Sequence, residues 1–367
     1  MKEVAIIGIQ GVPANYGGFE SLVENIIGEN TSAYIRYTIF CSGKDMPDKR
    51  REYKGCRLKY VGLHANGVSS IPYDILSMVL ACRGFDVILV LGTSGCIFLP
   101  LLRLLCKSKL VVNIDGLEHR REKWGRAARW FLRLSERCAV RNADVVIADN
   151  KGIQDYVTET YHRRSELIAY GGDHVMRNVS EERQQAILER YGLQDRPYAI
   201  TVCRIEPENN CHLTLQAFAR TGRTLVFIGN WRHSVYAQNL YRQYAGRENL
   251  KLLDAIYDLD TLFTLRRHTA CYVHGHSAGG TNPSLVEAMF FGRPILAYDV
   301  VYNRETTHNR AYYFANADEL VRLLSAPDLD GGVLKQIAEE NYTWRHIARQ
   351  YEVLYGLREL EYQNIYE

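Results

Sequence analysis

The stretch from Val273 to Asp299, VHGHSAGGTNPSLVEAMFFGRPILAYD, predicts a loop, a helix, a turn and a strand in that order. Asn282 is a favoured N-cap residue, and Pro283 suits the first helical position after it. The helix is expected to stop at Gly292, because glycine readily adopts the backbone conformation that follows a helix. The apolar run ILAYDV is then typical of a buried strand.

The loop ahead of this helix also has the features of an anion site. Gly279 and Gly280 let a ligand approach the backbone, and the free N–H groups of the helix start point along the helix dipole. Glu287 lies on the second turn, where a carboxylate can accept hydrogen bonds from hydroxyls. The alternative is a surface turn before an ordinary amphipathic helix, but the cap, proline, glutamate and strand together favour a site.

Length and composition indicate a globular enzyme with two domains. The 367 residues exceed the usual size of one core, and 47% of them are hydrophobic. A net charge of +3 gives no argument for nucleic acid. The nine cysteines are scattered without a CxxC pair, which indicates reduced thiols in a cytoplasmic protein. The first residues, MKEVAIIGIQ, are typical of a strand and not of a signal peptide.

Strands and helices alternate along the chain. Apolar runs of the first half, such as VAIIGI, DVILVLG and DVVIADN, are separated by helical segments that include a long helix from about Glu118 to Arg141. The pattern restarts near Val179 with YAITVCRI, TLVFIG, LKLLDA and ACYVHG. This alternation predicts an α/β protein with two doubly wound, Rossmann-like domains. We expect the domains to face a central cleft, with ligands at the carboxyl ends of the strands.

Two polar residues follow predicted strands. Arg204 ends YAITVCR and could clamp two phosphate oxygens, but an ion pair with Glu206 or Glu208 is an equal alternative. Asp115 ends KLVVNID and could orient a substrate hydroxyl or accept its proton, but a helix N-cap is equally compatible with its position.

The loop after the first strand carries Gly11, Gly17 and Gly18 ahead of a helix, so it can bring a second helix N-terminus to a ligand. Gly8 and Gly11 form only GxxG, without the third glycine of a dinucleotide fingerprint. A Rossmann oxidoreductase is therefore disfavoured.

No metal site is predicted. Asp258 and Asp260 form a D-x-D pair, but they precede LDTLFTLRR, where an aspartate caps a helix. His274 and His276 lie two residues apart at a strand end and could be ligands, although polar contacts in the cleft are favoured.

A basic stripe follows one predicted helix. Its members recur at steps of three or four residues and therefore share a face: Arg126, Arg129, Arg133, Arg137 and Arg141. Trp124, Trp130 and Phe131 lie nearby. Such a stripe suits an anionic membrane or a lipid diphosphate, whereas the alternative is a solvated face with inward tryptophans.

Together these motifs resemble the retaining GT-B glycosyltransferases of the superfamily that contains glycogen synthase and sucrose synthase. More closely, they resemble bacterial rhamnosyltransferases of capsule and surface-polysaccharide assembly. The motifs that carry the resemblance cover nearly the whole chain in the expected order: GIQGVPANYGGFE, NIDGLEHRREKW, IADNKGI, IAYGGD, CRIEPENN, HGHSAGGTNPSLVEAM and AYDVVYNRETT.

The resemblance implies an N-terminal acceptor domain over 1–175, a nucleotide-sugar donor domain over 176–345, and a C-terminal helix over 346–367 that packs back toward the N-terminal domain. It implies that Arg204 clamps phosphate and that Glu287 holds the donor ribose. The remaining donor contacts that it implies are Gly17, Gly18, Gly280, Thr281 and Asn282.

The chain departs from the family pattern at two positions. Gly279 stands where the first glutamate of an E-x7-E motif is expected, and Asn209 stands where a lysine usually follows the clamp arginine. Both departures caution against a glucose or N-acetylglucosamine donor and are compatible with a 6-deoxy sugar.

The implied activity is transfer of a hexose, best L-rhamnose from dTDP-rhamnose, to a hydroxyl of a lipid-linked saccharide. The resemblance implies retention of configuration, no cofactor and no metal, and a location at the inner face of the cytoplasmic membrane. Two alternatives stay open: a sugar-nucleotide 2-epimerase of the same architecture, and a nucleotide-binding protein without turnover.

Overall fold

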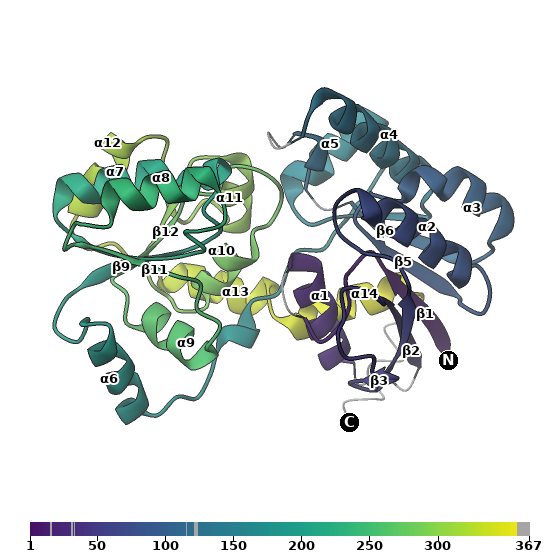
Figure 1. The fold of residues 1–367 in the computed structure, drawn as a ribbon, viewed down its shortest axis with the longest axis horizontal. Helices are drawn as coiled ribbons and strands as arrows, with labels where there is room; N and C mark the ends of the chain where they lie inside the picture. Colours follow the sequence, from purple (N-terminus) through teal and green to yellow (C-terminus); the bar gives the residue numbers. More distant parts are fainter. Residues whose placement is uncertain (15–16, 31, 33, 115, 121–123, 358–367) are drawn as a thin grey trace. The chain divides into compact units, whose positions relative to one another are not determined.

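The structure is a computed structural model that describes residues 1–357 apart from 15–16, 31, 33, 115 and 121–123. The chain forms two compact units (Figure 1). Unit 1 contains Met1–Tyr170 and the segment that begins at Trp344, and unit 2 contains Gly171–Thr343. The chain thus divides at 170 and 343, where the sequence places the domain boundaries at 175 and 345.

Unit 1 is built on an eight-stranded sheet of order β3-β4-β2-β1-β5-β6-β7-β8 in the described residues. All neighbouring strands are parallel except β3 and β4. The strands are β1 Lys2–Ile7, β2 Ile35–Ser42, β3 Glu52–Tyr53, β4 Cys56–Val61, β5 Val87–Leu91, β6 Lys109–Asn113, β7 Val145–Ala148 and β8 Glu166–Leu167. The helices are α1 Gly18–Gly28, α2 Ser70–Ala81, α3 Leu99–Leu105, α4 Arg126–Asn142, α5 Lys151–Tyr161 and α14 Trp344–Leu354.

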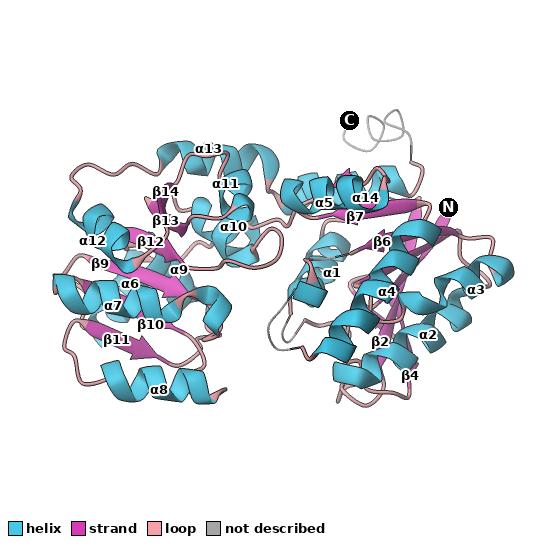
Figure 2. Ribbon diagram, turned by 90° about the horizontal axis from the view of Figure 1, so that it is seen from above, coloured by secondary structure: helices cyan, strands magenta, loops and turns pink. Residues whose placement is uncertain are grey.

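Helices cover both faces of this sheet. Helices α2, α3 and α4 lie side by side on one face, as both ribbon views show (Figures 1 and 2). Helix α14 packs with α1 in the apolar core, where Ile347 and Tyr351 are buried beside Val23 and Ile26. The Tyr351 hydroxyl also accepts a hydrogen bond of 2.9 Å from Asn113 Nδ2. The last helix therefore belongs to the core of unit 1.

Unit 2 is built on a six-stranded parallel sheet of order β11-β10-β9-β12-β13-β14 in the described residues. The strands are β9 Tyr198–Val202, β10 Thr224–Ile228, β11 Leu250–Leu253, β12 Cys271–His274, β13 Ile295–Tyr298 and β14 Tyr312–Phe314. The helices are α6 Glu181–Arg190, α7 Cys211–Thr221, α8 Val235–Tyr244, α9 Leu259–Arg267, α10 Pro283–Met289, α11 Val301–Thr306, α12 Ala317–Ser325 and α13 Gly332–Asn341. Helices α7, α8 and α12 cover one face, and α9 and α13 lie on the other (Figure 1).

Two helix boundaries differ from the sequence-based expectation. The helix expected to reach Gly292 ends at Met289, because its last turn tightens through a hydrogen bond of 3.2 Å from Phe291 N–H to Ala288 O. The helix expected from Glu118 begins only at Arg126, after an extended Gly125 that serves as its N-cap. The residues Glu118–Arg120 form a separate short 3₁₀ turn.

Candidate functional site

The strand order of unit 2 contains one point at which the connections between strands run to opposite sides of the sheet. Helix α7 leads from β9 toward β10, whereas α10 leads from the neighbouring β12 toward β13 on the opposite side. The carboxyl ends of β9 and β12 are therefore the topological switch point of this sheet, the place where doubly wound sheets bind ligands. The loop after β9 contains Arg204, and the loop after β12 contains the Gly279–Asn282 segment.

Hydrogen bonds fasten these two loops together. The Ser277 N–H donates to Glu208 O at 2.8 Å, and Asn210 Nδ2 donates to Gly275 O at 2.9 Å. The approach is so close that a Cβ at Gly275 would lie 2.2 Å from Asn209 O, so only glycine fits there. The Arg204 loop and the glycine loop consequently form one rigid rim.

The start of α10 has the predicted cap. The Asn282 side chain accepts a hydrogen bond of 3.0 Å from the Ser284 N–H, and Pro283 occupies the first turn. Gly279 has a φ of 95°, a conformation that glycine adopts without strain, and Thr281 is buried. The structure thus confirms the predicted capped helix behind a glycine loop.

Glu287 is held by an ion pair that the sequence did not predict. Arg266 Nη2 lies 2.5 Å from Glu287 Oε2, and His174 Nε2 lies 3.5 Å from Oε1. Burial on its own would raise the pKa of this carboxyl, but the charges and hydrogen bonds of Arg266 and His174 outweigh it and lower the pKa. Glu287 is therefore a fixed, ionised carboxylate.

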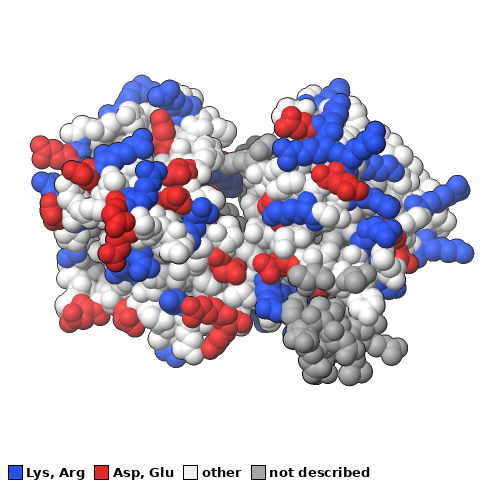
Figure 3. Space-filling model, turned by 90° about the horizontal axis from the view of Figure 1, so that it is seen from below, with Lys and Arg blue, Asp and Glu red and all other residues white. Residues whose placement is uncertain are grey.

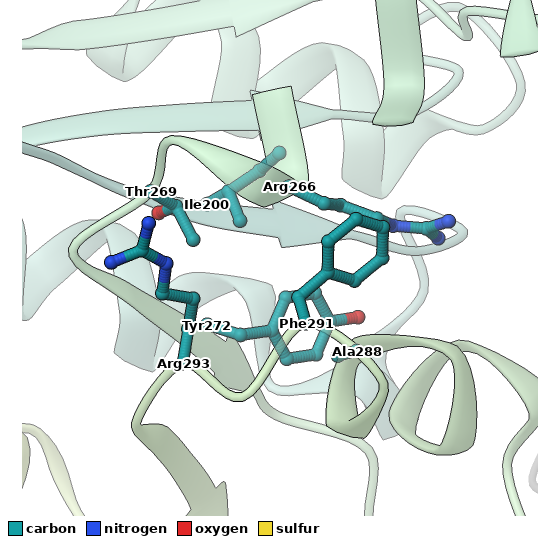
Figure 4. Close-up of a pocket in the computed structure, with 7 residues that line it drawn as sticks. All are labelled: Ile200, Arg266, Thr269, Tyr272, Ala288, Phe291 and Arg293. Atoms are coloured by element: carbon teal, nitrogen blue, oxygen red, sulfur yellow. The ribbon is translucent and has the colours of Figure 1, made fainter. Parts of the chain in front are cut away.

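Arg266 is positioned by an apolar cluster. Figure 4 shows its stem beside Phe291 and Tyr272, with the guanidinium directed out of the cluster. Its side chain is only 5% exposed. No local pattern in the sequence indicates this partner, because 21 residues separate Arg266 in α9 from Glu287 in α10.

Arg204 makes the expected local ion pair, but weakly. Its Nη2 lies 3.7 Å from Glu206 Oε2, and 43% of its side chain is exposed. An exposed pair at this distance contributes about 0–1 kcal/mol and holds the guanidinium loosely. Strand β9 ends at Val202, so Arg204 lies two residues beyond it rather than at its end. The side chain can turn toward an anion on the rim at little cost.

In unit 1, Gly17 and Gly18 begin α1 next to the corresponding divergence of β1 and β5. Gly17 has a φ of 125°, and a Cβ there would lie 1.9 Å from Glu20 Oε2. The Glu20 carboxylate accepts a hydrogen bond of 3.0 Å from the Gln10 N–H, and burial raises its pKa. Gly17 therefore lets Glu20 fold back onto the loop. Asp115 lies outside the described residues, and its role stays a prediction.

The D-x-D pair has the structural role that the helix position predicts. Asp258 caps α9 and accepts a hydrogen bond of 3.0 Å from the Thr261 N–H, while Asp260 pairs with Arg177 Nε at 2.7 Å. His276 is buried and bonds to Asn209, whereas burial and, to a smaller extent, the nearby His276 lower the pKa of the His274 ring. In the described part of the chain, no three His, Cys, Asp or Glu side chains form a group that could hold a metal ion.

The arginine stripe lies on an exposed face of α4. All five arginines from Arg126 to Arg141 are exposed, and Trp130 is 69% exposed. The acid of this helix, Glu136, is buried and accepts hydrogen bonds from Tyr156 at 2.8 Å and Tyr161 at 2.7 Å. Trp124 instead donates to Glu118 at 2.9 Å. Figure 3 shows Lys and Arg side chains over much of unit 1 on the face that it presents.

The second half of the chain matches a known enzyme family. Residues 183–325 match the family model described as Glycosyl transferases group 1. This segment is a group 1 glycosyltransferase domain. Residues 1–173 match a Domain of unknown function, DUF1972. The glycosyltransferase domain contains the β9 loop, the β12 loop and Glu287, so the rim described above belongs to the part that defines the family. No curated protein sequence matches the chain.

Solved structures extend the likeness to the whole chain. A sucrose-phosphate synthase from Thermosynechococcus elongatus superposes with a TM-score of 0.81 at 18% identity, over 97% of this chain and 98% of that chain. HepE from Anabaena, in complex with UDP-glucose, gives 0.76 at 15% identity, over 97% and 100%. Starch synthase IV from Arabidopsis thaliana, bound to ADP and acarbose, gives 0.71 at 13% identity, over 96% and 98%. The predicted GT-B fold is confirmed.

Proposed function

We propose that this glycosyltransferase moves a sugar from a nucleotide diphosphate sugar to a hydroxyl of a lipid-linked saccharide, with retention of configuration. The observation that carries the proposal is the rim of unit 2, where the Arg204 loop and the Gly280–Asn282 loop are fastened together at the divergence of β9 and β12. The similar HepE structure contains UDP-glucose, which supports a nucleotide-sugar donor.

Each part of the rim has a role in donor binding. Arg204, loosely paired and half-exposed, clamps the diphosphate in two-pronged fashion. Backbone groups of Gly280, Thr281 and Asn282 approach the diphosphate and sugar. Glu287 accepts hydrogen bonds from the ribose hydroxyls, and Arg266 keeps its carboxylate ionised and oriented for that contact.

Transfer then follows from charge stabilisation. The bond between the anomeric carbon and the diphosphate breaks, and Arg204 opposes the charge that grows on the leaving phosphate. The acceptor hydroxyl attacks from the same face and gives its proton to the departing phosphate oxygen. Asp115 orients that hydroxyl, and Gly17 and Gly18 of unit 1 give the substrates close access to the backbone. No metal is required, because the positive field comes from the protein.

We propose L-rhamnose, supplied as dTDP-rhamnose, as the donor sugar. The chain has Gly279 and Asn209 where charged side chains are expected in its family, so this part of the rim carries no charge with which to grip a hydroxyl-rich sugar. A 6-deoxy sugar offers fewer hydroxyls and suits such a rim. The acceptor belongs to surface-polysaccharide synthesis at the inner face of the cytoplasmic membrane.

Helices α2, α3 and α4 supply a surface for that membrane. The face of α4 presents Arg126–Arg141, and the neighbouring α3 exposes 80% of Leu104 and 62% of Leu105. The only acids of the three helices, Asp74 and Glu136, are both buried, so the exposed face is basic and apolar. Such a face binds anionic headgroups while its leucines contact the acyl boundary. No helix among the described residues is long and apolar enough to cross a membrane.

A donor panel tests the proposal. The enzyme is incubated with dTDP-rhamnose, UDP-glucose, GDP-mannose or UDP-N-acetylglucosamine and a lipid-linked sugar acceptor, and products are identified by mass spectrometry. Transfer from dTDP-rhamnose with retained anomeric configuration is expected. Conversion of a donor without acceptor would identify an epimerase, and binding without any product would identify a nucleotide-binding protein.

A further inference from the structure

The loop Gly92–Gly95, of sequence GTSG, follows β5 at the carboxyl edge of the unit 1 sheet. Strand β5 is a neighbour of β1, and the connections from these two strands run to opposite sides of the sheet. The loop therefore lies at the topological switch point of unit 1, where doubly wound sheets bind ligands. Neither the donor contacts nor the arginine stripe includes it.

Gly92 connects the loop to both elements that are proposed to serve the acceptor. Its N–H donates a hydrogen bond of 2.9 Å to Asn113 O at the end of β6, two residues before Asp115 in the chain. On the other side, a Cβ at Gly92 would lie 3.6 Å from the ring of Phe19, the second residue of α1. The loop is thus flanked by the strand that leads to Asp115 and by the start of α1.

Buried side chains of α2 and α4 hold the loop in place. The Ser135 hydroxyl of α4 donates to Thr93 O at 2.5 Å, and the Cys96 N–H donates to the same oxygen at 3.1 Å. A Cβ at Gly95 would lie 2.4 Å from Asp74 Cβ of α2, so only glycine allows this approach. The two helices that fix the loop also belong to the face proposed for the membrane.

Thr93 carries a polar group that the fold does not use. The residue is 8% exposed, and its hydroxyl has no hydrogen-bond partner among the described residues, whereas its carbonyl oxygen accepts two hydrogen bonds. Buried hydroxyls are normally hydrogen-bonded, so this one is available to a group from outside the protein. The four residues of the loop carry no charge, and a hydroxyl both donates and accepts. The matching group is therefore a sugar hydroxyl rather than a phosphate.

We infer that the Gly92–Gly95 loop is a subsite for the saccharide acceptor, in which the Thr93 hydroxyl forms a hydrogen bond with a hydroxyl of the acceptor sugar. Ser135 is a positioning residue that fixes the loop from α4. The contact contributes to acceptor binding and takes no part in proton transfer. This inference rests on the proposed transfer reaction and names an acceptor contact in unit 1.

The test uses the methyl glycosides of glucose, galactose and N-acetylglucosamine, which have no lipid chain and so report only the sugar contact. Their binding to the full-length protein is measured by saturation-transfer NMR without a donor. Thr93→Val keeps the shape of the side chain and removes the hydroxyl, Thr93→Ser keeps the hydroxyl, and Thr158→Val on the exposed side of α5 is a matched control.

The wild type is expected to bind at least one of the glycosides. Thr93→Val should bind that glycoside about three- to tenfold more weakly, the range for one neutral hydrogen bond. Thr93→Ser should recover most of the lost affinity, and Thr158→Val should stay within about twofold of the wild type. Ser135→Ala should also weaken binding, and adding Thr93→Val to it should cause little further loss, because both changes act on the same contact.

Two controls separate acceptor binding from a structural role. Because the Thr93 hydroxyl has no partner in the described part of the chain, Thr93→Val should melt at or above the wild-type temperature. Calorimetry with dTDP-rhamnose should give the same affinity for the wild type and Thr93→Val, because the proposed donor site lies in unit 2.

Four results would each overturn the inference: no binding of any glycoside by the wild type, equal binding by a folded Thr93→Val, a lower melting temperature of Thr93→Val, or an equal loss of dTDP-rhamnose affinity. If the glycosides bind as expected but receive no sugar from any donor of the panel, the proposed function fails and the sugar contact of Thr93 stands.

Discussion

Variants of the ion pair between Arg266 and Glu287 distinguish what the Glu287 carboxylate contributes to stability from what it contributes to donor binding. Arg266 is almost fully buried and its Nη2 lies 2.5 Å from Glu287 Oε2. In Glu287→Gln the guanidinium keeps a hydrogen-bond acceptor but loses its counter-charge. Arg266→Met leaves the carboxylate without its main partner, and the double variant removes both charges at nearly constant volume.

The stability effects follow from burial. Removing one partner of a buried pair costs about 3–5 kcal/mol, and we expect about 3 kcal/mol for Glu287→Gln because the amide still accepts from Arg266. In a unit of this size that loss lowers the melting temperature by about 6–12 °C. The double variant should recover part of this loss, because it removes the buried guanidinium that Glu287→Gln leaves without a counter-charge.

Donor binding should not follow the same pattern. Charge-assisted hydrogen bonds to a ribose contribute about 1.5–3 kcal/mol, so Glu287→Gln and the double variant should both bind the nucleotide sugar about 10- to 100-fold more weakly. Melting curves and calorimetry on the four proteins provide the comparison. If the double variant recovers donor affinity along with stability, Glu287 is only structural and the ribose contact is wrong.

The same pair predicts a pH effect. The pKa of Glu287 is lowered in the folded protein, so its contribution to stability is complete above the unfolded pKa and is lost as the pH falls below that value. In Arg266→Met, only His174 still offsets burial, so the pKa of Glu287 should rise. Donor affinity of that variant should then decline on acidification at a higher pH than in the wild type.

Three further predictions concern other parts of the molecule. Arg204→Gln should lower kcat strongly and change the melting temperature little, and Arg204→Lys should restore kcat only partly because lysine lacks the two-pronged fork. A loss of kcat that is matched by a loss of stability would indicate a structural ion pair. Activity should survive a chelator, and Asp258→Asn should cost at most about 1 kcal/mol of helix capping; activity abolished by chelation and restored by magnesium or manganese would contradict a metal-free phosphate site. Replacing Arg126, Arg129, Arg133 and Arg137 with glutamine should release the enzyme from anionic vesicles, at about 1 kcal/mol per arginine, and high salt should mimic the variant; salt-insensitive binding, or none by the wild type, would remove the membrane role.

Local patterns in the sequence predicted the fold and much of the rim. Asn282, Pro283 and the apolar strand after Pro294 specify a capped helix and a buried strand through residues that are neighbours in the chain, and both are present. The exposed stripe on α4 follows from helical spacing alone. The end of α10 at Met289 differs from the expected end at Gly292, because the backbone tightens after Met289 through the bond from Phe291 N–H to Ala288 O.

Partners that come from distant segments could not be predicted in this way. Arg266 lies near the end of α9 and His174 lies in a short turn, and both are far from Glu287 in the chain. In the sequence, Asn209 differs from its family only as an asparagine in the place of a lysine. Its function as the partner of His276 depends on the close approach of the two loops at Gly275, which only the folded sheet determines.

The most direct test of the account is acceptor-dependent release of nucleoside diphosphate. The wild type is mixed with dTDP-rhamnose in the presence and absence of the lipid-linked acceptor, beside Arg204→Gln and Glu287→Gln, and free dTDP is measured over time. We expect release only when donor and acceptor are both present, with each variant at least about tenfold slower than the wild type. Release at the wild-type rate from folded forms of both variants would contradict the assignment of the unit 2 rim as the donor site.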